Sequence, residues 1–110
     1  MEHENLNIKE IMESRLRAVD ESLHTISAAE LQALTTELFP SSNEPWLERF
    51  LTIIRDPASG TFYQAMADDH IHVLYCHEKN IGMWFVRGTG KGPLQTKELN
   101  IMKEAVEARP

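Results

Sequence analysis

The first patterned stretch of the chain runs from Ile8 to Ile26, where apolar residues recur every three or four positions. This spacing places them on one side of a helix, with the charged residues between them on the other side. Part of the stretch keeps a heptad repeat, but for only about two repeats, fewer than a coiled coil needs. We therefore expect a first helix that packs on its own domain.

A second helix is predicted after Ser27. Ser27 and Glu30 have the spacing of a capping box, in which the side chain of each residue bonds the backbone N–H of the other. The apolar stripe of this helix consists of Leu31, Leu34 and Leu38. Phe39-Pro40 and the polar residues after it are expected to end the helix, because proline disfavours a helical residue before it.

A third helix is expected to begin at Ser42 or Asn43, either of which has a side chain suited to capping. Pro45 falls in its first turn, where the missing N–H of proline costs nothing. The broad apolar face of this helix consists of Trp46, Leu47, Phe50, Ile53 and Ile54. The stretch 56–60, with its proline and glycine, is expected to end it.

The second half of the chain becomes strand-like, with apolar segments at residues 61–67, 70–76 and 81–86. Short polar stretches separate these segments, which predicts a three-stranded antiparallel meander. Helical spacing returns over 94–108. The expected architecture is α+β, with three N-terminal helices, three strands and a C-terminal helix (α-α-α-β-β-β-α). We expect residues 1–110 to form a single domain.

Two-residue turns between the strands would divide the residues of the sheet into two faces. One face would carry Phe62, Met66, Ile71, Val73, Tyr75, Trp84 and Val86. The other would carry Tyr63, Ala65, His70, His72, Leu74, Cys76, Ile81, Met83 and Phe85. Both faces are too apolar to lie in solvent. We expect helices on both sides, or a second copy of the chain on one side, and the surplus of apolar surface favours a homodimer.

The composition, with 42% hydrophobic and 25% charged residues, is that of an ordinary globular protein. Cys76 is the only cysteine, which excludes an intramolecular disulfide and favours a reducing compartment. The first residues lack the apolar core of a signal peptide, and no apolar run approaches the roughly 18 residues of a membrane span. We therefore expect a cytoplasmic protein that has no membrane contact and no cofactor.

Charge is distributed unevenly along the chain. The net charge is −6, and residues 1–60 hold eleven acidic residues against five basic ones, whereas residues 61–110 hold six of each. An acidic molecule repels phosphate backbones, so nucleic acid is not an expected partner. The stretch from Lys79 to Lys97 has four basic residues and no acidic one. We therefore expect a small anion to bind at this stretch.

A glycine-rich segment within this basic stretch precedes the last predicted helix. It consists of Arg87, Gly88, Thr89, Gly90, Lys91 and Gly92. Backbone N–H groups at the start of a helix bind anions, and Arg87, Lys91, Lys97 and the hydroxyl of Thr89 would assist. Its glycines do not have the spacing of a Walker A loop or of a dinucleotide-binding loop. The segment is therefore a candidate phosphate or carboxylate site, or a connection that uses glycine for its backbone freedom.

His70 and His72 are the candidates for a metal site, because alternate residues of a strand can present two imidazoles to one ion. Cys76 cannot join them, since six residues span roughly 20 Å along a strand. The alternative is a pair of surface or cross-strand histidines. Cys76 itself is expected to be a small core residue and not a nucleophile.

Two functions of different classes remain. The first is a non-catalytic protein-interaction module that acts as a homodimer and meets a protein partner through its acidic helices or its sheet. The second is a small-anion binding protein, or an enzyme, that uses the basic stretch from Arg87 to Lys97. The absence of a catalytic motif favours the first of these.

Overall fold

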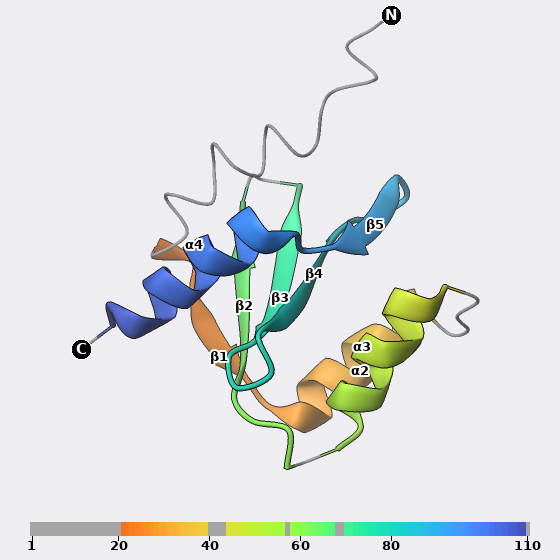
Figure 1. The fold of residues 1–110 in the computed structure, drawn as a ribbon. Coiled ribbons are helices and arrows are strands. Elements are labelled where there is room, and N and C mark those ends of the chain that lie inside the picture. The colour runs from red at the N-terminus through yellow and green to blue at the C-terminus, as the bar shows by residue number, and fades with distance from the viewer. Residues whose placement is uncertain (1–20, 40–43, 57, 68–69, 110) are drawn as a thin grey trace, which may run out of the picture.

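The computed structural model of the chain describes residues 21–39, 44–56, 58–67 and 70–109. These residues form a sheet with helices on both of its faces (Figure 1). In chain order the elements are β1 (His24–Ile26), α2 (Ala28–Leu38), α3 (Pro45–Ile54), β2 (Phe62–Met66), β3 (His72–Cys76), β4 (Ile81–Val86), β5 (Gly90–Pro93) and α4 (Thr96–Glu107). The strands are antiparallel and lie in the sheet in the order β1-β2-β3-β4-β5.

The expected order of three N-terminal helices, three strands and a C-terminal helix is wrong. The described residues form five strands and three helices, and two of the helices follow the first strand. His24–Ile26, expected as the end of the first helix, is the edge strand β1, which pairs with β2. Ser22 continues this contact, since its Oγ accepts the backbone N–H of Met66 at 2.9 Å. Residues 1–20 lie outside the described residues.

The second helix has the predicted limits. Ser27 is the N-cap of α2, its Oγ accepts the backbone N–H of Glu30 at 3.1 Å, and Oε1 of Glu30 accepts the N–H of Ser27 at 3.1 Å. Helix α3 begins at Pro45, and its N-cap is Glu44, whose side chain makes no capping bond. The predicted capping residues of α3, at 42 and 43, lie outside the described residues.

The first hairpin of the sheet is not a two-residue turn. Met66 lies opposite His72, and the N–H of Ala67 donates to the carbonyl of Ile71 at 2.9 Å. Residues 68–70 therefore lie between the strands, and this odd number moves every side chain of β2 to the other face from the one expected. Phe62 and Met66 share a face with His72, not with Ile71. The expected grouping of β3 with β4 is confirmed by their register.

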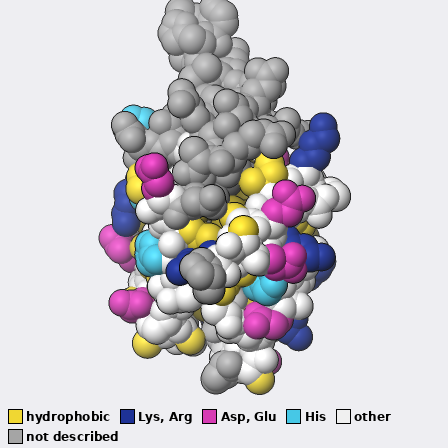
Figure 2. All heavy atoms as spheres, turned by 90° about the vertical axis from the view of Figure 1, so that its left-hand side faces the viewer, with side chains coloured by type: hydrophobic (Ala, Val, Ile, Leu, Met, Phe, Trp, Pro, Cys, Tyr) yellow, Lys and Arg dark blue, Asp and Glu magenta, His cyan; other side chains and the backbone are white. Residues whose placement is uncertain are grey.

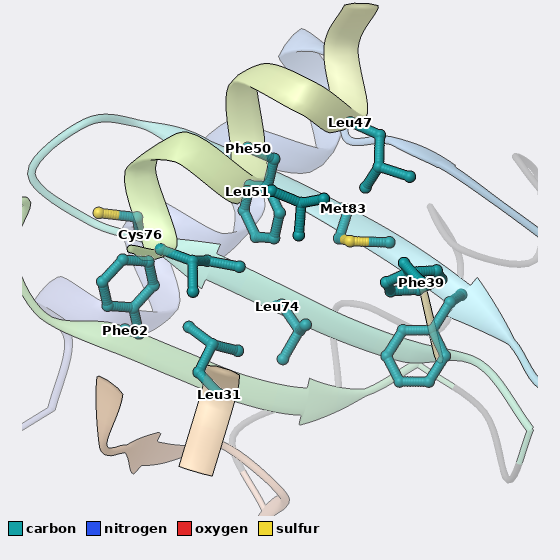
Figure 3. Packing of buried hydrophobic residues seen from close by; sticks show 11 residues of the cluster. Leu31, Phe39, Leu47, Phe50, Leu51, Phe62, Leu74, Cys76 and Met83 are labelled. Carbon is teal, nitrogen blue, oxygen red and sulfur yellow. The ribbon is translucent and has the colours of Figure 1, made fainter. Parts of the chain in front are cut away.

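Helices on both sides, one of the two arrangements expected, cover the sheet. Helices α2 and α3 lie on one face, and α4 crosses the other (Figure 1). Figure 3 shows Leu47, Phe50 and Leu51 of α3 directed at Leu74 and Met83 of the sheet. On the other face, Met102 of α4 packs with strand residues in a second buried cluster. Burial of this apolar surface is the main stabilisation of the fold.

The described surface beside β1 and the end of α4 has mixed charge. In Figure 2 the acidic and basic side chains are interspersed on this face, with hydrophobic side chains between them. No helix among the described residues has both the length and the apolar character needed to cross a lipid bilayer.

Candidate functional site

The glycine-rich segment is a β-hairpin and not a loop at the start of a helix. Val86 pairs with Gly90, Gly88 has a φ of 76°, and the N–H of Thr89 donates to the carbonyl of Val86 at 3.0 Å. Pro93, the residue before the helical spacing of 94–108, ends strand β5. Helix α4 begins at Thr96. The expected cradle of backbone N–H groups at a helix start is therefore wrong.

A tryptophan explains one of the glycines in this hairpin, Gly92. A Cβ built on Gly92 would lie 2.8 Å from Nε1 of Trp84, closer than real Cβ contacts allow. A Cβ built on Gly90 would lie 4.0 Å from Cη2 of the same ring, an ordinary contact. The indole thus lies across β5, and only a residue without a side chain fits beneath it at position 92.

A row of side chains crosses four strands at the end of the sheet that includes this hairpin. Met66 pairs with His72, His72 with Phe85, and Phe85 with Lys91. Because directly paired residues of antiparallel strands point to the same face, the row lies on one face of the sheet. It is the face that α2 and α3 cover, since Phe85 belongs to their buried cluster.

Aromatic contacts fix the middle of the row. The rings of His72 and Phe85 are stacked, with centroids 4.9 Å apart and planes 13° from parallel. Phe39, at the end of α2, meets the ring of Phe85 edge-on at a centroid distance of 5.9 Å. Nζ of Lys91 lies 5.7 Å from the centroid of Phe39. The end of α2 and the β4–β5 hairpin are therefore held together by rings and one cation.

Two adjoining hollows open beside this row. The larger, of about 450 Å³, is lined by His70, His72, Val86, Arg87 and Thr89. Among the described residues that line it, none is acidic, and four carry a nitrogen or hydroxyl group able to donate a hydrogen bond.

The smaller hollow holds about 240 Å³. It shares Val86, Arg87 and Thr89 with the larger one, and it is otherwise lined by the end of α2, the ring of Phe85 and the β4–β5 hairpin. The two hollows thus meet at the hairpin residues that line both.

His72 has an unusual environment in the larger hollow. Its Nδ1 is buried and, among the described residues, is the one buried side-chain nitrogen or oxygen without a hydrogen-bond partner. Burial lowers the pKa of His72 below its ordinary 6.5, and the nearby charge of Arg87 lowers it further. Both effects favour the neutral imidazole, and one of its polar atoms is unused, although burying such an atom unpaired costs free energy.

Two ion pairs border the hollows. Arg87 Nη1 lies 3.6 Å from Glu37 Oε2, and both side chains are more than half exposed. Lys91 Nζ lies 3.6 Å from Glu44 Oε1. Exposed ion pairs of this kind stabilise a protein little, typically by about 0–1 kcal/mol, so Arg87 can exchange Glu37 for another anion at small cost.

The structure brings together residues that the sequence assigned to different sites. The larger hollow combines the metal candidates His70 and His72 with Arg87 and Thr89 of the anion candidate. Of the other predicted anion ligands, Gly88, Gly90 and Lys91 line the smaller hollow. Gly92 lies under Trp84 instead, and Lys97 lies on α4, outside the described lining of both hollows.

No cluster of three side chains suited to hold a metal ion occurs in the described parts of the chain. Leu38, Phe39 and Phe85 are lining residues that sequence reasoning missed. Their apolar character identified them only as core or helix-end residues. A signal for them would need the packing of the end of α2 against β4 and β5, which no local pattern contains.

Cys76 lies far from this row, at the opposite end of β3. Its side chain is fully buried, and burial raises the pKa of its thiol above the ordinary value. Its Sγ is 3.8 Å from the carbonyl oxygen of Ser59. A buried thiol of raised pKa is a poor nucleophile.

No protein-family model matches this chain, and neither a curated protein nor a solved structure shows significant similarity to it. The geometry of the hollows is therefore the basis for a functional proposal.

Proposed function

We propose that this protein binds a small anion, a phosphate or a carboxylate, in the hollow lined by His70, His72, Arg87 and Thr89. The observation that carries the proposal is the lining of this hollow, where four side chains able to donate a hydrogen bond and no acidic one meet among the described residues. An anion placed in the hollow would accept a hydrogen bond from the imidazole and offset the positive charge of Arg87.

Each lining side chain has a defined part in this proposal. Arg87 supplies the permanent charge and a planar fork of donors that matches the oxygens of a carboxylate or phosphate. His72 supplies one N–H from a site shielded from water, where a hydrogen bond to an anion is stronger than in solvent. Thr89 and the exposed His70 supply additional donors at the rim.

Glu37 is the internal competitor in this proposal. Its carboxylate already lies within ion-pair distance of Arg87, at 3.6 Å. It thus shows that the guanidinium is accessible to a carboxylate. Since both side chains are largely exposed, the incoming anion need only replace a weak pair.

The test is a titration with inorganic phosphate at constant ionic strength, followed by two-dimensional NMR of the backbone amides. We expect saturable shifts at residues 70–72 and 86–90. Arg87→Ala should weaken binding about tenfold, because a hydrogen bond to a charged group contributes about 1.5–3 kcal/mol. Arg55→Ala is the matched control, since Arg55 is exposed at the end of α3 and lines neither hollow.

Two outcomes would overturn the proposal. One is a set of small shifts spread over the surface that do not saturate. The other is an equal loss of affinity in Arg87→Ala and Arg55→Ala, which would mean that phosphate responds only to overall charge.

The homodimer, the protein partner and the cytoplasmic location stay predictions from the sequence. The apolar surplus that favoured a dimer has another explanation, because helices cover both faces of the sheet. Met66 is the one large hydrophobic side chain exposed among the described residues, at 37%. A second copy of the chain is therefore not needed to bury the described sheet.

A further inference from the structure

The two adjoining hollows differ in chemistry. The larger one is lined mainly by donors, whereas the smaller one has an apolar wall of Leu38, Phe39 and Phe85. Arg87 lines both. A ligand that fills both hollows would therefore carry its charge at one end, next to the guanidinium, and an apolar group at the other.

The apolar wall favours a flat ring over a chain. Phe39 and Phe85 already meet edge to face, and the ring of His72 stacks on that of Phe85. An aromatic ring that enters such a cluster gains the same offset and edge-on contacts beyond the burial of its area. A cavity of about 150 Å³ lined by apolar side chains suffices for benzene, so the volume of about 240 Å³ accommodates one ring with a short substituent.

We infer that the ligand of this site is a small aromatic acid, with its carboxylate or phosphate on His72 and Arg87 and its ring against Leu38, Phe39 and Phe85. This inference rests on the proposed anion site and adds the part of the ligand that gives selectivity. The ring would exclude water from the charged contacts and so strengthen them. Lys91, which lies 5.7 Å from the Phe39 centroid, borders the ring position and adds a second positive charge.

The experiment compares matched ligands by NMR titration of the complete chain at constant ionic strength. The probes are acetate and phenylacetate, which share the anion, and benzyl alcohol, which has the ring without the charge. We expect phenylacetate to bind at least about tenfold more tightly than acetate, because the ring buries apolar surface. Benzyl alcohol should bind more weakly than phenylacetate by a similar factor, because it lacks the charge-assisted hydrogen bonds.

Variants on one helix separate the ring contact from general effects. Leu38→Gln replaces an apolar residue of the smaller hollow that is only partly buried, so the fold should tolerate it. It should remove most of the preference for phenylacetate and leave the affinity for acetate unchanged. Leu34→Gln, at an equally half-buried position of α2 that lines neither hollow, is the control and should keep the preference.

The outcomes distinguish this inference from the proposal on which it rests. If acetate and phosphate bind but phenylacetate binds no more tightly, the aromatic inference is wrong and the anion site stands. If benzyl alcohol binds as tightly as phenylacetate, the charge takes no part and both are wrong. If no probe binds in a saturable way, both are wrong as well.

Discussion

His72 and Phe85 pair directly across β3 and β4, and their rings stack with centroids 4.9 Å apart. The two residues belong to different strands, and no local sequence pattern predicts that they are in contact. The pairing places the imidazole against an aromatic wall and in the same hollow as Arg87, which lies two residues beyond Phe85 and whose charge lowers the pKa of His72. The proposed site depends on this arrangement.

The neutral state of His72 predicts a dependence of stability on pH. Because the folded protein lowers the pKa of His72 below 6.5, the unfolded chain takes up the proton first as the pH falls. The free energy of unfolding should therefore decrease below about pH 6.5. Urea denaturation of the wild type and His72→Gln at about pH 7.5 and about pH 5.5 measures this effect. An equal decrease in both proteins would show that His72 does not contribute.

The contact between Trp84 and β5 predicts different effects on stability for two similar substitutions. Gly92→Ala places a Cβ 2.8 Å from Trp84 Nε1 and should destabilise the protein by about 1–3 kcal/mol, as overpacking does. In Gly90→Ala the new Cβ would lie 4.0 Å from the same ring, so this substitution should be tolerated. Chemical denaturation followed by tryptophan fluorescence measures both. Equal stability of the two variants would contradict the placement of the indole.

The ion pair of Glu37 with Arg87 predicts that removal of the Glu37 carboxylate increases the affinity for phosphate. If Glu37 competes with the ligand for Arg87, Glu37→Gln should bind phosphate about twofold to fivefold more tightly, the scale of an exposed ion pair. Glu48→Gln removes the same charge from an exposed position on α3 and is the control. A titration in which both variants gain equally would assign the effect to net charge.

A polar network at the other end of the sheet predicts a high-pH titration. The hydroxyl of the buried Tyr75 lies 3.3 Å from His77 Nδ1 and donates to Asn80 Oδ1 at 3.3 Å, and Glu107 lies 3.7 Å from His77 Nε2. Burial, followed by the charge of Glu107, raises the pKa of Tyr75 to about 12. Absorbance of the phenolate should show a step near this pH that Tyr75→Phe lacks.

This shift also has a consequence for stability. The folded-state pKa of Tyr75 lies above the ordinary 10.0, so the stabilisation is present below pH 10.0 and is lost as the pH rises toward about 12. Between about pH 9 and about pH 11, Tyr75→Phe should therefore lose less of its free energy of unfolding than the wild type. A parallel loss in both proteins would contradict the buried phenol.

Local pattern predicted the elements that local interactions determine. The capping box of Ser27 and Glu30 fixed the start of α2, and apolar spacing indicated α3, α4 and three strands. The spacing of apolar residues failed to predict the structure where pairing between strands determines it. Leu23 and Ile26 have helical spacing, yet His24–Ile26 becomes a strand because the edge of β2 is available to it.

The sheet shows the same limit in two other places. Strand β5 contains two glycines and a proline, residues depleted in strands, yet it pairs with β4 and Trp84 lies across it. The face of β2 depended on whether the number of residues between Ala67 and Ile71 is odd or even, which no composition rule determines. The site was predicted in two halves for the same reason, since His72 and Arg87 meet only through the pairing of β3 with β4.

The most direct test of the anion site is the pKa of the His72 imidazole, measured by NMR with and without saturating inorganic phosphate. The account predicts a pKa below 6.5 in the free protein, a rise on phosphate binding, and a smaller rise in Arg87→Ala. The rise follows from linkage, because an anion that bonds the imidazole binds its protonated form more tightly. A His72 pKa that phosphate leaves unchanged would contradict the account.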